Sequence, residues 1–184
     1  MVKYLSDINK IGYYRFRHPE ACLILDTNIL LLFLIGIYDK GYLKYCPLMT
    51  DNGKNYTEEH FDLLEKILKI FIGRIVITPQ ILAEVNSLSR IRLFKGKKLN
   101  EYFPRIIQEI EKWEENYIHF RTLLKEREQV IQFGFTDISI IATAKDKGYA
   151  ILTDELDLYR NFLEQVAIIS FSTIVAYELH KVGM

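Results

Sequence analysis

Four short, largely apolar runs rich in β-branched residues limit what this chain can fold into. Segments with helical spacing of apolar residues separate them, and the runs are Cys22 to Leu25, Arg74 to Thr78, Tyr149 to Thr153 and Val166 to Ile169. Strands that are apolar on both sides are typical of a parallel sheet covered by helices on both faces. The pattern therefore predicts an α/β fold with a central parallel sheet.

Capping signals and apolar stripes predict helices around these strands. Thr57 can cap a helix, Pro79 suits the first turn of the next one, and Gly148 can terminate a helix just before the third strand. A long apolar stripe with a break near Asn116 predicts a helical hairpin, or one bent helix, over about residues 101–131.

The length of 184 residues fits a single domain over residues 1–184. We expect about residues 1–20 to form an N-terminal extension and about residues 39–56 to form an inserted loop, since Pro47 and Asp51-Asn52-Gly53 are turn signals. Two widely separated cysteines without a C-x-x-C motif argue against a disulfide framework and against a zinc site.

Composition and charge exclude several classes of protein. With 49% hydrophobic residues the chain is not disordered, and 24 basic against 24 acidic residues supply no whole-molecule attraction to nucleic acid. The longest uninterrupted apolar stretch, Ile29 to Ile37, is far shorter than the about 20 residues that a membrane helix needs. The start of the chain lacks a secretory signal pattern, so we expect a cytoplasmic protein without a membrane partner.

Acidic residues fall at or near the ends of the predicted strands. Asp26 ends the first strand, Glu84 lies on the helix after the second, Asp137 opens a helix, and Asp154 ends the third strand. In open parallel sheets the ligand crevice lies beyond the carboxyl ends of the strands, so we expect these carboxylates to converge there. Each also has a structural interpretation, because acids favour helix N-termini and Glu84 can be a solvated helix residue.

Four ionised carboxylates in one place would repel each other strongly. At about 5 Å and an effective dielectric near 20, each pair costs roughly 3 kcal/mol. Either raised pKa values or bound divalent cations must relieve this repulsion. Oxygen ligands without nearby histidine or cysteine favour Mg²⁺ or Mn²⁺ over Zn²⁺.

Three segments in this order carry a family resemblance: LDTN at Leu25 to Asn28, TPQILAEV with Glu84, and FTDISIIATAKDKGYAILTDELDLY from Phe135 to Tyr159. Together they resemble the PIN-domain family of ribonucleases. The resemblance implies a three-layer α/β/α fold whose acidic cleft binds Mg²⁺ or Mn²⁺ and cuts RNA. Mapped by motif, it implies acidic ligands at Asp26, Glu84, Asp137 and Asp154, supporting polar residues at Asn28, Ser139 and Thr153, and Asp157 as a competitor for the last acid.

The implied chemistry is metal-assisted attack of water on a phosphodiester, in which two cations stabilise the attacking and leaving oxygens. We therefore expect an endoribonuclease of the toxin type or of the RNA-processing type. DNA stays open as a substrate, because this hydrolysis does not require the ribose hydroxyl. An antitoxin, another protein partner and a homodimer stay open as well.

The densest basic run follows Glu84 and contains Arg90, Arg92, Lys95, Lys97 and Lys98. One interpretation is that it binds phosphates and draws RNA across the metals, with Phe94 available to stack on a base. The other is a solvated loop. A second, weaker basic candidate comprises Arg121, Lys125 and Arg127.

Two further hypotheses compete with the nuclease. Asp26 after a first strand also resembles the nucleophile of haloacid-dehalogenase phosphatases, but the second acid expected two residues later is Asn28 here. The third hypothesis is a non-catalytic module that binds a protein partner through the segment from Tyr102 to Ile131 or through the N-terminal tyrosines.

Overall fold

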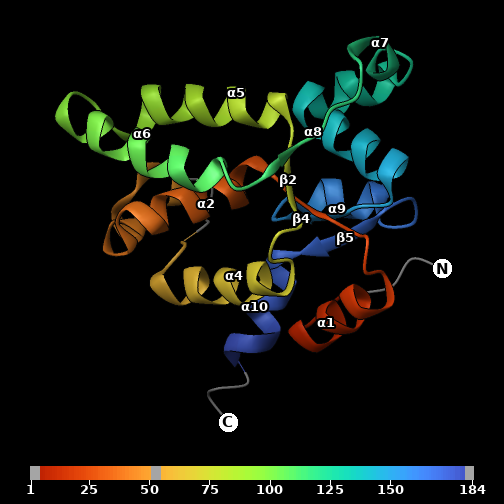
Figure 1. Cartoon of the computed structure of the whole chain (residues 1–184), viewed down its shortest axis with the longest axis horizontal. Helices are drawn as coiled ribbons and strands as arrows, with labels where there is room; N and C mark the ends of the chain where they lie inside the picture. Colours follow the sequence, from red (N-terminus) through yellow and green to blue (C-terminus); the bar gives the residue numbers. More distant parts are fainter. Residues whose placement is uncertain (1–4, 51–54, 181–184) are drawn as a thin grey trace.

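The computed structural model describes residues 5–50 and 55–180. Five strands form one sheet in the order β3-β2-β1-β4-β5, and every neighbouring pair is parallel (Figure 1). The strands are β1 (Leu23–Leu25), β2 (Ile75–Ile77), β3 (Glu114–Glu115), β4 (Ala150–Thr153) and β5 (Ala167–Ser170). The predicted α/β class with a central parallel sheet is therefore confirmed.

Helices make up most of the remaining chain. They are α1 (Ile8–Arg17), α2 (Thr27–Tyr38), η1 (Lys40–Tyr45), α3 (Pro47–Thr50), α4 (Glu58–Ile70), α5 (Pro79–Leu88), η3 (Ser89–Leu93), α6 (Lys97–Ile110), α7 (Phe120–Leu123), α8 (Arg127–Lys147), α9 (Leu156–Phe162) and α10 (Phe171–His180). In the view of Figure 1, α5, α6 and α8 lie above the strands and α1, α4 and α10 below them, which is compatible with three layers.

The predicted helix signals hold. Thr57 precedes α4, and its backbone N–H donates to the His60 ring nitrogen at 2.9 Å. Thr78 accepts from the Ile81 N–H before Pro79 at the first position of α5, and Gly148 ends α8 in the left-handed region at φ 70°. These signals depend on local backbone geometry, so they can be recognised without knowledge of the tertiary fold.

The apolar helix α2 forms the centre of the core. Every residue from Ile29 to Gly36 is buried, and α2 packs against α4, where Gly36 lies directly against the Phe61 ring. No helix within residues 5–50 and 55–180 combines the length and apolarity that crossing a membrane requires. The strongly hydrophobic segment after Asp26 is thus a buried core helix.

The predicted helical hairpin over residues 101–131 is wrong. α6 ends at Ile110, the chain then forms the short edge strand β3, and α7 follows before α8 begins. Glu114 and Glu115 pair with Val76 and Ile77, and the Asn116 N–H donates to the Ile77 carbonyl at 3.0 Å. The conformation of residues 114–116 therefore depends more on hydrogen bonds to the free backbone groups at the edge of β2 than on the apolar stripe.

The two segments expected to lie outside the core are more ordered than predicted. α1 in the N-terminal extension buries Ile11 and Tyr14, and Asp7 caps it. The inserted segment contains η1 and α3, which bury Leu43 and Met49, so it is largely helical. The turn signal Asp51-Asn52-Gly53 lies outside the described residues.

Candidate acidic active site

A cavity of about 300 Å³ lies at the carboxyl ends of β1 and β4, between α5 and α8. Four of the side chains that line it are carboxylates, and the lining residues are Asp26, Thr27, Asn28, Glu84, Leu88, Phe133, Gly134, Phe135, Thr136, Asp137 and Glu155. The structure thus brings together three of the four predicted acids, Asp26, Glu84 and Asp137, although they are far apart in the sequence.

Asp26 is fixed by the sheet itself. Its backbone N–H donates to the Leu152 carbonyl at 3.0 Å, which extends the β1–β4 pairing by one residue. Its Oδ2 accepts a hydrogen bond of 2.7 Å from Thr153 Oγ1, and the Asp26 side chain is only 3% exposed. Thr153, which the resemblance implied as a supporting residue, therefore orients this carboxylate.

Glu84 reaches the cavity from the middle of α5. Its Oε2 accepts a hydrogen bond of 2.9 Å from Thr27 Oγ1, and Thr27 is the residue after Asp26. Pro79 and the Thr78 cap fix the start of α5 at the end of β2, so Glu84 is held over the same edge of the sheet. The prediction of site residues omitted Thr27, and Asn28 beside it lines the cavity as expected.

Asp137 enters the cavity from α8, which is interrupted at Gly134 with φ 89° and ψ 170°. Burial, and with it the negative charges of Asp26, Glu155 and Glu84, raise the pKa of Asp137 to about 8. In the absence of a cation most Asp137 side chains are therefore protonated at neutral pH. The other three carboxylates therefore lie close enough to Asp137 to influence its protonation.

Asp154 occupies a different environment from the one predicted. Its Oδ2 accepts a short hydrogen bond from the Tyr56 hydroxyl, and its Oδ1 accepts from the Ser172 N–H at 3.1 Å. Burial and the charge of Asp154 raise the pKa of Tyr56 above its ordinary value, so this hydroxyl stays a donor. The acid that lines the cavity beside Asp26, Glu84 and Asp137 is Glu155, the next residue along the chain.

Two other residues that the resemblance implied do not line this cavity. Asp157 lies in the first turn of α9 and is exposed to solvent. Ser139 is buried in α8, and its hydroxyl donates to the Thr136 carbonyl at 2.7 Å. Ser139 therefore supports the helix turn that carries Asp137, and it does not reach the cavity.

The donor set suits a hard divalent cation. All the candidate ligands are oxygen atoms, which Mg²⁺ and Mn²⁺ prefer. However, no group of three or more Asp, Glu, His or Cys side chains in residues 5–50 and 55–180 is arranged to hold one metal ion. Two carboxylates accept hydrogen bonds from Thr27 and Thr153 instead. The residues fit a cation by their chemistry and by lining one cavity, but their side chains would have to come closer together to coordinate it.

The predicted basic run lies around η3 and the start of α6, at the end of α5 away from the sheet (Figure 1), and it does not line the acidic cavity. Arg90 donates to Asn86 at 3.0 Å and stacks over Phe103, and Lys97 forms a 3.8 Å ion pair with Glu101. All five basic residues of the run, Arg90, Arg92, Lys95, Lys97 and Lys98, are exposed. They are thus available to bind phosphate only at a distance from the carboxylates.

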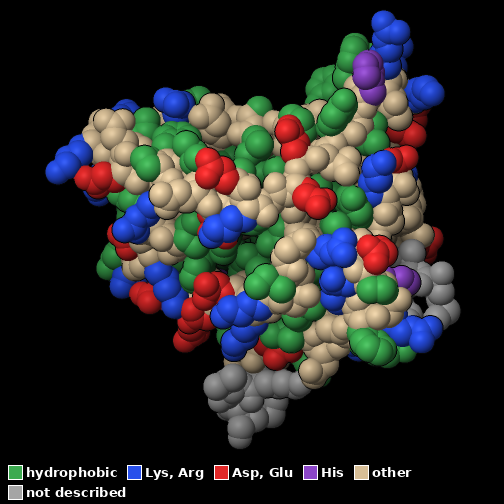
Figure 2. All heavy atoms as spheres, in the orientation of Figure 1, with side chains coloured by type: hydrophobic (Ala, Val, Ile, Leu, Met, Phe, Trp, Pro, Cys, Tyr) green, Lys and Arg blue, Asp and Glu red, His purple; other side chains and the backbone are tan. Residues whose placement is uncertain are grey.

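Phe94 cannot stack on a nucleic acid as predicted, because it is only 3% exposed. Its ring packs against Tyr38, Tyr42 and Tyr102. The weaker basic candidate, Arg121, Lys125 and Arg127, lies in and beside α7, where basic side chains gather at the upper right of Figure 2. Elsewhere on that face acidic and basic side chains are interspersed.

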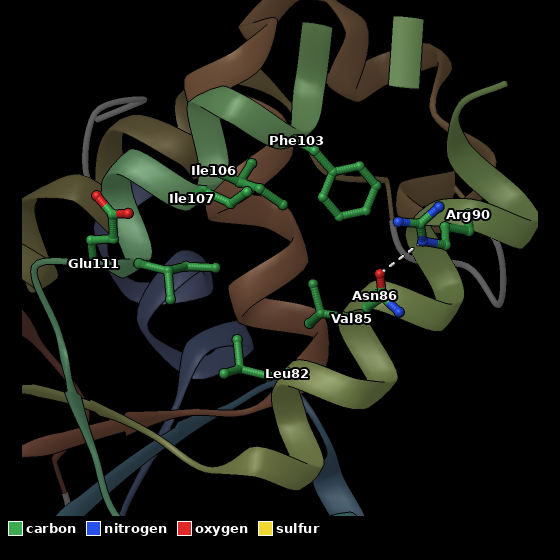
Figure 3. Close-up of a pocket in the computed structure, with 9 residues that line it drawn as sticks. Leu82, Val85, Asn86, Arg90, Phe103, Ile106, Ile107 and Glu111 are labelled. Carbon is green, nitrogen blue, oxygen red and sulfur yellow. Dashed lines mark hydrogen bonds between the residues drawn. The ribbon is translucent and has the colours of Figure 1, made fainter. Parts of the chain in front are cut away.

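A second cavity of about 440 Å³ lies between α5 and α6 (Figure 3). Leu82 and Val85 of α5 face Phe103, Ile106 and Ile107 of α6 across it, with Arg90 at one end and Glu111 at the other. Its lining is almost entirely apolar, so it offers no acid–base or metal chemistry. We refer to it below as the α5–α6 groove.

Comparison of the chain with protein-family models, with curated proteins and with solved structures found no significant match. The fold and the acidic cavity are therefore the basis for any functional assignment.

Proposed function

We propose that this protein is a nuclease that uses Mg²⁺ or Mn²⁺ to hydrolyse phosphodiester bonds, with RNA as its substrate. The observation that carries the proposal is the convergence of four carboxylates, Asp26, Glu84, Asp137 and Glu155, on one cavity at the carboxyl ends of the strands. A raised pKa at one of them is typical of a site built to hold positive charge. The choice of RNA rests on the family resemblance of the sequence.

Each side chain has a distinct role in this proposal. The four carboxylates would hold the cations, which supply an activated water and stabilise charge on the phosphate oxygens. Thr153 and Thr27 orient Asp26 and Glu84 through their hydroxyl groups. Asp137 gives up its proton when positive charge enters the cavity, because that charge offsets the repulsion by its three acidic neighbours.

The test is RNA cleavage by purified variants with Mg²⁺ or Mn²⁺. We expect Asp26→Asn, Asp137→Asn and Glu155→Gln each to lower the rate at least about 100-fold, because each removes a charged ligand. Asp157→Asn is the matched control, since Asp157 is an exposed acid near the same strand end and should keep its rate. Metal-dependent cleavage that survives Asp26→Asn would remove the proposal.

Adjacent acids allow the geometry of the site to be tested as well. If Glu155 is the fourth acid, Glu155→Gln abolishes cleavage, whereas Asp154→Asn changes the stability of the fold more than the affinity for Mn²⁺. The reason is that Asp154 bonds to Tyr56 and Ser172 rather than facing the cavity. The opposite result would restore Asp154 as the fourth acid.

A second candidate function is a non-catalytic module that binds protein, and the α5–α6 groove favours it. An amphipathic helix with an acidic residue facing Arg90 and a basic residue facing Glu111 would match the apolar floor and charged ends of this groove. Calorimetry with Mn²⁺ separates the two candidates. A pure binding module should show no millimolar or tighter metal site that disappears in Asp137→Asn.

A further inference from the structure

Phe135 is a large apolar side chain exposed at the acidic cavity. It lines the cavity together with the four carboxylates, yet 53% of its surface remains accessible. Phe133, two residues earlier, packs edge-on against Phe162 with 5.3 Å between the ring centroids. No aromatic ring among the described residues packs against Phe135 in this way. Phe135 is therefore not needed to fill the core, and its flat ring is free to meet a ligand.

The break in α8 sends the two phenylalanines to different surroundings. Gly134 stands between them at φ 89° and ψ 170°, a backbone conformation that L side chains rarely adopt. Both side chains line the cavity, but the Phe133 ring also packs against Phe162 of α9, whereas no such ring contact involves Phe135 among the described residues.

We infer that Phe135 is a stacking platform for one nucleobase next to the bond that the enzyme cuts. The inference rests on the proposed nuclease function. Acidic oxygens suit a phosphodiester only when cations intervene, whereas an exposed aromatic ring suits the flat face of a base. A paired base within a duplex does not offer that face, so Phe135 selects substrates with an unpaired base at this one position.

The experiment combines changes in the protein with changes in the RNA. Single-turnover cleavage is measured on a single-stranded RNA and on copies that carry one abasic nucleotide at successive positions. In the wild-type protein we expect one position, adjacent to the cut, where removal of the base slows cleavage by about 5- to 150-fold, the range for one stacked base.

Phe135→Ala should slow cleavage of the intact RNA by a similar factor and should be insensitive to the abasic nucleotide at that position. Phe135→Trp should restore the rate, because a larger ring still stacks. Phe16→Ala is the matched control, since Phe16 is 80% exposed on α1 and does not line the cavity. Its rate should equal that of the wild type.

The outcomes separate this inference from the proposed function. If Phe135→Ala cleaves intact RNA at the wild-type rate, or loses the same factor on intact and abasic RNA, Phe135 does not stack on a base and the inference fails alone. If the wild-type protein cuts no nucleic acid with Mg²⁺ or Mn²⁺, both fail. A thermal unfolding curve of Phe135→Ala that matches the wild type shows that any loss of rate is not a loss of fold.

Discussion

Asp137 links the charge of the cavity to the stability of the fold. Burial and the charges of Asp26, Glu155 and Glu84 raise its pKa from the ordinary value of 3.8 to about 8. In the unfolded chain these neighbours are dispersed, so the pKa of the same carboxyl returns toward the ordinary value. Between these two pKa values the folded state binds a proton that the unfolded state has released.

The free energy of unfolding should therefore fall as pH rises from about 4 to about 8, because the folded state binds more protons over this window. One proton limits the slope to about 1.4 kcal/mol per pH unit, and solvent screening of this partly exposed group narrows the pH window over which the slope applies. Asp137→Asn lacks the titrating group, so its unfolding free energy should decline less steeply.

Urea unfolding at a series of pH values, without divalent cations, measures both slopes. Asp157→Asn is the matched control, because it removes an exposed acid that does not line the cavity. Equal slopes for the wild type and Asp137→Asn would show that Asp137 does not hold a proton in the folded state at neutral pH.

The sequence itself contained a physical reason why Glu155, rather than Asp154, lines the cavity. Side chains at positions two apart share one side of an extended segment, so Glu155 is expected on the side of Thr153. Because Thr153 donates to Asp26, the same side leads into the cavity.

The burial of Phe94, by contrast, could not be predicted from the sequence. It depends on contacts with three tyrosines from α2, η1 and α6, and no local pattern in the basic run indicates these contacts.

At the scale of elements, signals within the sequence predicted those parts of the fold that are buried or locally capped. The four apolar runs coincide with β1, β2, β4 and β5, all of which are buried nearly throughout. β3 was missed because it has two exposed glutamates and no apolar pattern. Glu114 and Glu115 form a strand only because the fold places them beside β2, where they pair with Val76 and Ile77.

The break in α8 at Gly134 lies three residues before Asp137, where the sequence predicted that a helix opens. We expect Gly134→Ala to lower the free energy of unfolding by about 1 to 3 kcal/mol, because a φ of 89° with a ψ of 170° is strained for any residue with a Cβ. No atom lies within 4 Å of that Cβ, so the loss comes from the backbone and not from a clash.

Gly12→Ala is the matched control for this change. Gly12 lies inside α1, has helical backbone geometry and also has no atom within 4 Å of an added Cβ. Alanine there should stabilise the protein by about 0.5 to 1 kcal/mol, because it favours the helix. Urea unfolding compares the two variants, and equal stabilities would contradict a strained backbone at Gly134.

Across the whole molecule, α5 separates two surfaces of opposite character. Glu84 and Leu88 face the acidic cavity, whereas Leu82 and Val85 face the apolar α5–α6 groove. The two predicted basic clusters lie at the far end of α5 and around α7, and no described Lys or Arg side chain lines the cavity. Any electrostatic attraction of a polyanion is therefore local, and cations in the cavity are needed to bring a phosphate close to the carboxylates.

The same charge distribution predicts how cations affect the stability of the whole protein. A ligand that binds only the folded state at about 100 times its Kd stabilises it by about 2.7 kcal/mol. For a chain of 184 residues, each kcal/mol raises Tm by about 2 to 4 °C, so saturating Mn²⁺ should raise Tm by roughly 5 to 11 °C. The gain is specific to the cavity, because a molecule without net charge gains little from general screening.

Differential scanning fluorimetry with increasing Mn²⁺ measures this shift, and a chelator should reverse it. NaCl at equal ionic strength is the control for screening and should shift Tm by no more than about 1 °C. In Asp26→Asn the shift with Mn²⁺ should nearly disappear, because that variant loses the buried carboxylate held between β1 and β4. An equal shift in Asp26→Asn would place the cation elsewhere on the molecule, and the acidic cavity would then have no role in binding it.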